Sequence, residues 1–210
     1  MTVLSKSAIL SPERCYIHWL TSLDTKDYNN VLRTAEALFQ EREPHTVATM
    51  CSGTENPIIW LYAFARVTRS RILEVPLEHP QASASLVLRH VFSCEISREK
   101  QKYIQRHFHC ELLFPDITCL GRRQAYDLKS KSWKDAPSSR HVVAGTSCKD
   151  MSTQKSNDKH NVLCSGVGSS SETMLGLLAC CAVHKPWLVS GENVITMLTA
   201  GVCNESVDFT

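Results

Sequence analysis

The stretch HTVATMCSGTENPIIWLYAFARV, residues 45–67, decides the expected fold. Its first six residues, 45–50, are a short run of the kind that forms strands. A small and polar stretch, 51–57, comes next, and residues 58–67 are apolar enough for a buried helix. Pro57 suits the first helical turn, where its missing N–H group would have no intrahelical partner. This stretch therefore predicts a strand, a turn and a helix.

The same order of elements continues along the chain. A polar connector at 121–140 separates two of the later strands. Five strands separated by helices or long connections predict an α/β fold, with a mainly parallel sheet and flanking helices. The further strands are expected at 85–96, 111–117, 140–146 and 185–193, and the further helices at 97–108 and 166–184.

The first 44 residues have a different character. Apolar residues recur at helical spacing in 27–43, which predicts an amphipathic helix that Pro44 ends. No motif that carries chemistry is present in residues 1–44. We therefore predict two parts: an N-terminal helical appendage at 1–44 and an α/β domain at 45–210.

Composition excludes several classes of protein. The chain has 210 residues, of which 43% are hydrophobic and 21% charged, which is ordinary for a globular protein and unlike a disordered, collagen-like or coiled-coil chain. The net charge of +2 does not by itself indicate a nucleic-acid or membrane partner. No apolar run approaches the ~20 residues of a membrane-spanning helix. The first residues lack an uninterrupted apolar core, so we expect no secretory signal. The 10 cysteines include no C-x-x-C pair, and we expect reduced thiols.

Polar residues follow the predicted strands. Ligands of parallel α/β sheets bind at the carboxyl ends of the strands, so these residues are the candidate site. Gly53 would allow close approach of a ligand to the backbone, and Glu95 could accept hydrogen bonds from ribose hydroxyls. Taken singly, each also has an ordinary explanation, as a turn glycine or a solvated carboxylate. Asp116 after the third strand is likewise a common turn residue.

A cysteine and a carboxylate follow the last two strands. Cys148 lies in the polar turn GTSCKDMS, where Lys149 and a helix N-terminus would lower the pKa of its thiol. An accessible thiolate is a nucleophile, although an unreactive loop cysteine is the simpler interpretation of this residue alone. Glu192, in the run Glu192-Asn193-Val194, could serve as an acid or a hydrogen-bond donor, or cap a helix.

In this order, the five features resemble the cytosine-C5 DNA methyltransferase family. The first three motifs of that family correspond here to CSGTE, VFSCEIS and FPDI. The fourth corresponds to AGTSCKDMS, the fifth to SSSET and the sixth to GENV. The resemblance covers about residues 45–195. The loop GTSCKDMS is similar to that of divergent algal and protist members.

The resemblance implies a Rossmann-like fold that binds S-adenosylmethionine and methylates C5 of cytosine in DNA, RNA not being excluded as the substrate. The cofactor would lie along Ser52, Gly53 and Thr54, with Glu95 on its ribose. Asp116 and Ile117 would lie at its adenine.

The resemblance also implies the catalytic residues. Cys148 would attack C6 of a cytosine flipped out of its helix, and Glu192 would hold and protonate N3. Asn193 would orient the nucleophile loop. No metal is implied.

The chain departs from the family pattern in three respects. Ser147 replaces the proline before the nucleophile, and the first motif lacks its second glycine. No Q-x-R-x-R motif, target-recognition domain or final motif follows Val194. We therefore expect a catalytic domain incomplete at its C-terminus, with a second chain or a missing segment supplying target recognition. Its substrate implies the nucleus, with an organelle as the alternative.

Three other functions stay open. The chain could be an inactive or partner-dependent cofactor-binding fragment of such an enzyme. It could be a metal-binding interaction module built on His107, His109, Cys110 and Cys119, although their spacing is unlike that of structural zinc sites. A dinucleotide-dependent oxidoreductase is disfavoured by the absence of G-x-G-x-x-G.

Overall fold

The computed structural model describes residues 11–39, 43–51, 53–146 and 168–192. The chain divides into two compact units, of which the first comprises Met1–Thr46 and Asn56–Arg89. The second unit comprises Val47–Glu55 and His90–Thr210. The predicted division into parts 1–44 and 45–210 stays a prediction.

The first unit is built from three helices, α1 (Pro12–Ser22), α2 (Thr25–Phe39) and α3 (Asn56–Ile72). Both α1 and α2 pack on α3, and the ring of Tyr16 on α1 lies 5.6 Å from that of Trp60 and 5.3 Å from that of Phe64, centroid to centroid. The predicted helices at 27–43 and 58–67 are confirmed as α2 and α3. Helix α1 was not predicted. Two short 3-10 helices follow α3, at Pro80–Ala82 and Ala84–Leu86.

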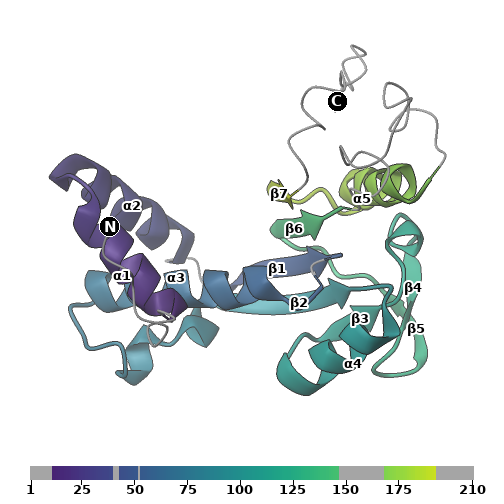
Figure 1. Cartoon of the computed structure of the whole chain (residues 1–210), viewed down its shortest axis with the longest axis horizontal. Coiled ribbons are helices and arrows are strands. Elements are labelled where there is room, and N and C mark those ends of the chain that lie inside the picture. The colour runs from purple at the N-terminus through teal and green to yellow at the C-terminus, as the bar shows by residue number, and fades with distance from the viewer. Residues whose placement is uncertain (1–10, 40–42, 52, 147–167, 193–210) are drawn as a thin grey trace, which may run out of the picture. The chain divides into compact units, whose positions relative to one another are not determined.

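A five-stranded sheet forms the second unit, to which the first unit contributes the first residues of two strands. The strand order is β3-β2-β1-β6-β7, and the pairs β2–β3, β1–β6 and β6–β7 are parallel (Figure 1). This confirms the predicted α/β fold and all five predicted strands. The strands are β1 (His45–Met50), β2 (Leu88–Cys94), β3 (Leu112–Phe114), β6 (His141–Gly145) and β7 (Leu188–Glu192).

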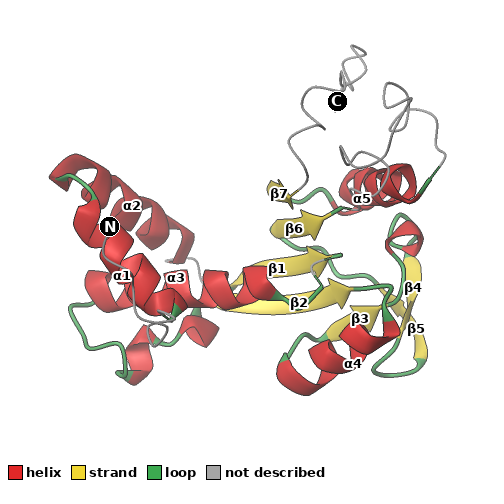
Figure 2. Ribbon diagram, in the orientation of Figure 1, coloured by secondary structure: helices red, strands yellow, loops and turns green. Residues whose placement is uncertain are grey.

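Two helices cover opposite faces of this sheet, α4 (Arg98–His107) and α5 (Ser169–His184) (Figure 2). Neighbouring residues of a strand point to opposite faces, and Leu113 and Phe114 of β3 show which helix covers which face. Leu113 packs with Ile104 of α4, whereas Phe114 joins the main core cluster, to which Leu177 of α5 belongs. The predicted helices 97–108 and 166–184 are therefore confirmed.

The connector 121–140 contains an antiparallel hairpin, β4 (Gln124–Asp127) and β5 (Ser132–Asp135), so our prediction of a polar connector was wrong there. Along β4 exposed and buried residues alternate, and Asp127 is 1% exposed. Its carboxylate accepts hydrogen bonds from the backbone N–H groups of Leu113 at 2.9 Å and Ser130 at 2.8 Å. Because a charged residue occupies one of the buried positions of β4, the sequence lacks the alternation of apolar and polar residues that would have predicted this strand. A further 3-10 helix spans Ile117–Cys119. Among the helices of the described residues, none is long and apolar enough to cross a membrane.

Candidate active site

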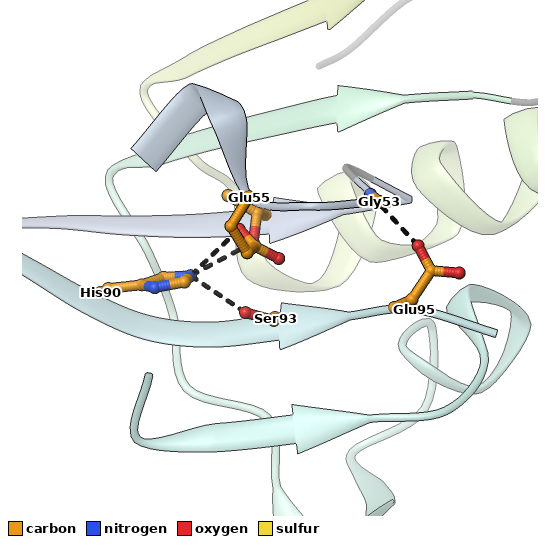
Figure 3. A network of polar contacts seen from close by, with 6 residues as sticks. Gly53, Glu55, His90, Ser93 and Glu95 are labelled. Carbon is orange, nitrogen blue, oxygen red and sulfur yellow. Dashed lines mark hydrogen bonds and ion pairs between the residues drawn. The ribbon is translucent and has the colours of Figure 1, made fainter. Parts of the chain in front are cut away.

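The turn after β1 and the end of β2 meet through one hydrogen bond. The backbone N–H of Gly53 donates to Oε2 of Glu95 at 3.2 Å (Figure 3). Gly53 is buried and has φ +70°, a conformation that side chains with a Cβ rarely adopt. A Cβ at this position would also lie 3.3 Å from Nζ of Lys100. The turn therefore depends on glycine for its conformation, and the Lys100 side chain lies beside it.

Glu95 is held from several sides and is only 4% exposed. Its Oε1 accepts from the backbone N–H of Ser97 at 2.8 Å, and its backbone N–H donates to the carbonyl of Phe114 at 3.0 Å. The side-chain amide of Gln101 donates to the Glu95 carbonyl at 2.6 Å. Both carboxylate oxygens thus have a donor within the protein. A carboxylate has about four lone-pair positions, so each oxygen can accept one more hydrogen bond.

Asp116 and Ile117 lie at the end of β3 and have structural contacts of their own. Asp116 caps the turn that follows, and its Oδ1 accepts from the backbone and hydroxyl groups of Thr118 at 2.9 and 2.8 Å. Ile117 is 4% exposed and belongs to the main core cluster. A Cβ on Gly176 of α5 would lie 3.1 Å from Ile117, so α5 packs directly against this residue.

The ends of β6 and β7 meet the end of β1. A Cβ on Gly145 would lie 3.1 Å from the carbonyl oxygen of Cys51 and 3.5 Å from Oε2 of Glu192. Glu192 pairs in register with Gly145 and is exposed. Since β1 lies between β2 and β6, Gly53, Glu95 and Glu192 all stand at the carboxyl edge of the sheet. The strand order reverses there, which is where open α/β sheets bind their ligands.

Three of the nine predicted site residues lie outside the described residues, namely Ser52, Cys148 and Asn193. Thr54 is exposed on the turn after β1. The structure therefore places the described residues of the predicted cofactor site at the same edge of the sheet as Glu192, the one predicted catalytic residue among the described residues.

Cys51 lies beside this edge as well. Burial raises the pKa of its thiol to about 11, helped by the carboxylates of Glu95 and Asp116 and opposed by Lys100. Burial likewise raises the pKa of Cys94, and that of Cys180 to about 12. These thiols are protonated at neutral pH and are therefore poor nucleophiles. The described cysteines named here have structural surroundings rather than catalytic ones.

The candidate metal cluster is not assembled. Within the described ranges, no group of three or more His, Cys, Asp or Glu side chains is placed to hold a metal ion. Cys110 is buried with Ile104 and Leu113, whereas Cys119 packs against the main core cluster.

The sequence analysis missed a buried polar network next to the Gly53 turn. Glu55 is fully buried with φ +59°, and its carboxylate lies 3.9 Å from Nε2 of His90 (Figure 3). The same nitrogen contacts the hydroxyls of Thr49 at 3.1 Å and Ser93 at 3.2 Å. Burial lowers the pKa of His90 to about 4, so its ring is neutral at neutral pH and its contact with Glu55 is not an ion pair.

Lys100 was also missed. It stands five residues after Glu95, in the first turn of the helix that follows β2. Only this position in the sequence could have predicted that Lys100 lies at the carboxyl edge of the sheet. A helix that follows a strand begins near the end of that strand, so its first turn lies close to the edge. For Glu55, a charged residue two places after the turn glycine gave no sign of burial.

Comparison with known proteins identifies the family of the chain. No known protein-family profile matches the chain. A curated relative, DNA (cytosine-5-)-methyltransferase DMT5 from the fungus Cryptococcus neoformans var. grubii, is 38% identical over 149 residues, which are 70% of this chain. The matched region is 6% of the length of that relative, so the chain corresponds to a small part of it. By this similarity, the chain belongs to the cytosine-C5 DNA methyltransferase family.

Proposed function

We propose that this chain is a methyltransferase catalytic domain that transfers a methyl group from S-adenosylmethionine to C5 of cytosine in DNA. The observation that carries the proposal is the 38% identity to a DNA cytosine-5-methyltransferase over 70% of the chain. The meeting of Gly53, Glu95 and Glu192 at one edge of the sheet supports it.

The edge fits the proposed cofactor. Gly53 has no side chain between its backbone and the Lys100 ammonium, so a ligand held by Lys100 would lie close to the backbone of the turn. Glu95 would accept hydrogen bonds from the ribose hydroxyls with its remaining lone pairs. Bound here, S-adenosylmethionine would supply a methyl group activated by its positively charged sulfur. The residues proposed to hold it are Ser52, Gly53, Thr54, Glu95, Asp116 and Ile117.

The proposed chemistry on the cytosine uses three side chains. The thiolate of Cys148 adds to C6, and Glu192, protonated, donates to N3 so that the negative charge developing on the ring is stabilised. C5 then accepts the methyl group. Loss of the C5 proton to a base and departure of the thiolate from C6 restore the aromatic ring and the free enzyme. Asn193 is proposed to orient the loop that carries Cys148.

A covalent trap tests this proposal. DNA containing 5-fluorocytosine has no proton at C5, so the thiolate cannot leave after methyl transfer. With S-adenosylmethionine present, the full chain should form a covalent complex detectable by mass spectrometry at Cys148. The variant Cys148→Ser should form none, whereas Cys15→Ser, a thiol in the first unit, should react like the unaltered chain.

Two other results would contradict the proposal. Adduct formation by Cys148→Ser would remove Cys148 from its proposed role. Binding of NAD in place of S-adenosylmethionine would favour an oxidoreductase.

A second candidate is a cofactor-binding chain that needs a partner or a further segment to methylate DNA. The 6% share of the relative that this chain spans favours it. Cofactor binding without the covalent trap would support this candidate, and the substrate, DNA or RNA, would then be set by the partner. Because the proposed substrate is DNA, we propose the nucleus as the site of action.

A further inference from the structure

Lys100 reaches from helix α4 over the turn that follows β1. Its Nζ lies 3.3 Å, and its Cδ and Cε 3.8 Å, from where a Cβ on Gly53 would stand. The proximity of its charge opposes the rise in the pKa of Cys51. The exposed Lys100 side chain therefore lies at the candidate cofactor site although it stands in none of the predicted motifs.

Charged groups of both signs lie near the Cys51 thiol, and Lys100 is the positive one. The carboxylates of Glu95 and Asp116 both act on Cys51, and Lys100 acts on the same thiol with the opposite sign. Among the described residues, no carboxylate lies within ion-pair distance of the Lys100 ammonium. Because no carboxylate of the described residues forms an ion pair with it, the Lys100 ammonium can form one with a negatively charged group of a ligand.

We propose that Lys100 binds the carboxylate of the amino-acid portion of the cofactor and so determines which adenosyl compounds this site accepts. This inference rests on the proposed function. S-adenosylmethionine carries two positive groups, its sulfonium and its ammonium, and one negative group, its carboxylate. The Lys100 ammonium, which lies 3.3 Å from where a Cβ on Gly53 would stand, matches the negative group.

The inference predicts which ligands depend on Lys100. S-adenosylhomocysteine, the demethylated product, has the carboxylate, whereas 5′-methylthioadenosine has the adenine, ribose and thioether without the amino-acid portion. Replacing Lys100 by Met should weaken binding of S-adenosylhomocysteine about 5- to 10-fold, as expected for an exposed ion pair with hydrogen bonding. Affinity for 5′-methylthioadenosine should not change.

Titration calorimetry of the full chain with both compounds tests this. Lys102→Met is a matched control, because Lys102 lies on the same helix and pairs with Glu99 at 3.1 Å. It should bind both compounds as the unaltered chain does. Lys100→Arg, which keeps the charge, should retain most of the affinity for S-adenosylhomocysteine.

The outcomes separate the two proposals. Selective loss of S-adenosylhomocysteine binding in Lys100→Met supports the inference. Unchanged affinity, or an equal loss for both compounds, overturns it and leaves the proposed function intact. If the unaltered chain binds neither compound, the proposed cofactor site fails, and the role of Lys100 fails with it.

Discussion

At the residue scale, Glu95 has a structural role and a proposed binding role. Its carboxylate holds the Gly53 turn and the start of α4, and it is the proposed acceptor for the ribose hydroxyls. The variant Glu95→Gln keeps the size of the side chain but replaces one acceptor oxygen by a donor. We expect it to weaken binding of S-adenosylhomocysteine by about 1–3 kcal/mol, or about 5- to 150-fold, since a buried hydrogen-bond partner is lost.

Calorimetry checks this expectation, with Glu99→Gln as the control. Glu99 is an exposed carboxylate in the first turn of α4, four residues after Glu95, and its replacement should leave affinity unchanged. Affinity equal to that of the unaltered chain in Glu95→Gln would contradict the ribose role.

The sequence could predict a site residue only where its position relative to the end of a strand determines its location in the fold. Glu95 directly follows β2 and Asp116 stands two residues after the end of β3, so their presence at the carboxyl edge could be inferred from the chain. Glu55 could not be placed in this way, because burial of a charged side chain depends on neighbours far away in sequence. Its neighbour His90 stands in β2, and only the folded sheet brings the two together.

The buried His90 predicts a pH dependence of stability. Its pKa is lowered from 6.5 to about 4 by burial, which outweighs the opposing hydrogen bond with the backbone of Phe92. Below pH 6.5 the unfolded chain therefore binds a proton that the folded chain does not, and stability falls as the pH drops toward 4. We expect His90 to contribute a loss of about 1–2 kcal/mol between pH 7 and pH 5.

Chemical denaturation of the full chain at both pH values measures this loss. His90→Phe cannot titrate, so the difference between pH 7 and pH 5 should shrink in this variant, whatever its absolute stability. His18→Gln, at an exposed position of α1, should keep the full difference. An equal pH difference in His90→Phe and the unaltered chain would show that His90 titrates alike in both states.

At the scale of elements, the five strands of the sheet were predictable because they are short apolar runs bounded by turn residues. The hairpin β4–β5 was not, since one of the two buried residues of β4 is Asp127. The charge of Asp127 is satisfied by backbone N–H groups of its own turn and of β3. Helix α1 was missed for a related reason. Its contact with α3 runs through aromatic rings, and the apolar periodicity of its sequence is weak.

The packing of α5 gives a prediction at this scale. A Cβ on Gly121 would lie 2.6 Å from the Cβ of Ala179 on α5, closer than real Cβ atoms approach one another. Gly121→Ala should therefore push α5 outward and lower the free energy of unfolding by about 1–3 kcal/mol, the usual cost of overpacking. Thermal unfolding followed by circular dichroism measures it.

Gly191 in β7 is the matched control for this substitution. A Cβ there would meet nothing within 4 Å, so Gly191→Ala should leave the unfolding temperature close to that of the unaltered chain. If Gly121→Ala were as stable as Gly191→Ala, α5 would not be packed against the turn at residue 121 as the structure has it.

At the scale of the whole molecule, the chain leaves the helical unit after Thr46 and returns to it at Asn56. The turn that carries Gly53 is thus part of the sheet unit, whereas α3, directly after it, packs with α1 and α2. This interleaving could not be read from the sequence, where residues 45–67 look like one continuous strand–turn–helix unit.

Because the chain forms two compact units, we expect a destabilising substitution in one unit to loosen that unit and leave the other unchanged. Tyr16→Ala removes the ring that contacts Trp60 and Phe64, which should cost about 2 kcal/mol in the helical unit. Hydrogen exchange followed by mass spectrometry should then show faster exchange in α1 and α3, with β6 and α5 unchanged.

Gly121→Ala is the reciprocal control, because residue 121 belongs to the sheet unit. It should accelerate exchange in α5 and leave α1 and α3 unchanged. Equal acceleration in both units by either substitution would contradict the division, because it would mean that the helical unit and the sheet unit open as one cooperative structure. If each substitution accelerates exchange only in its own unit, the proposed cofactor edge keeps its structure when the helical unit is weakened. The variant Tyr16→Ala should then bind S-adenosylhomocysteine as the unaltered chain does.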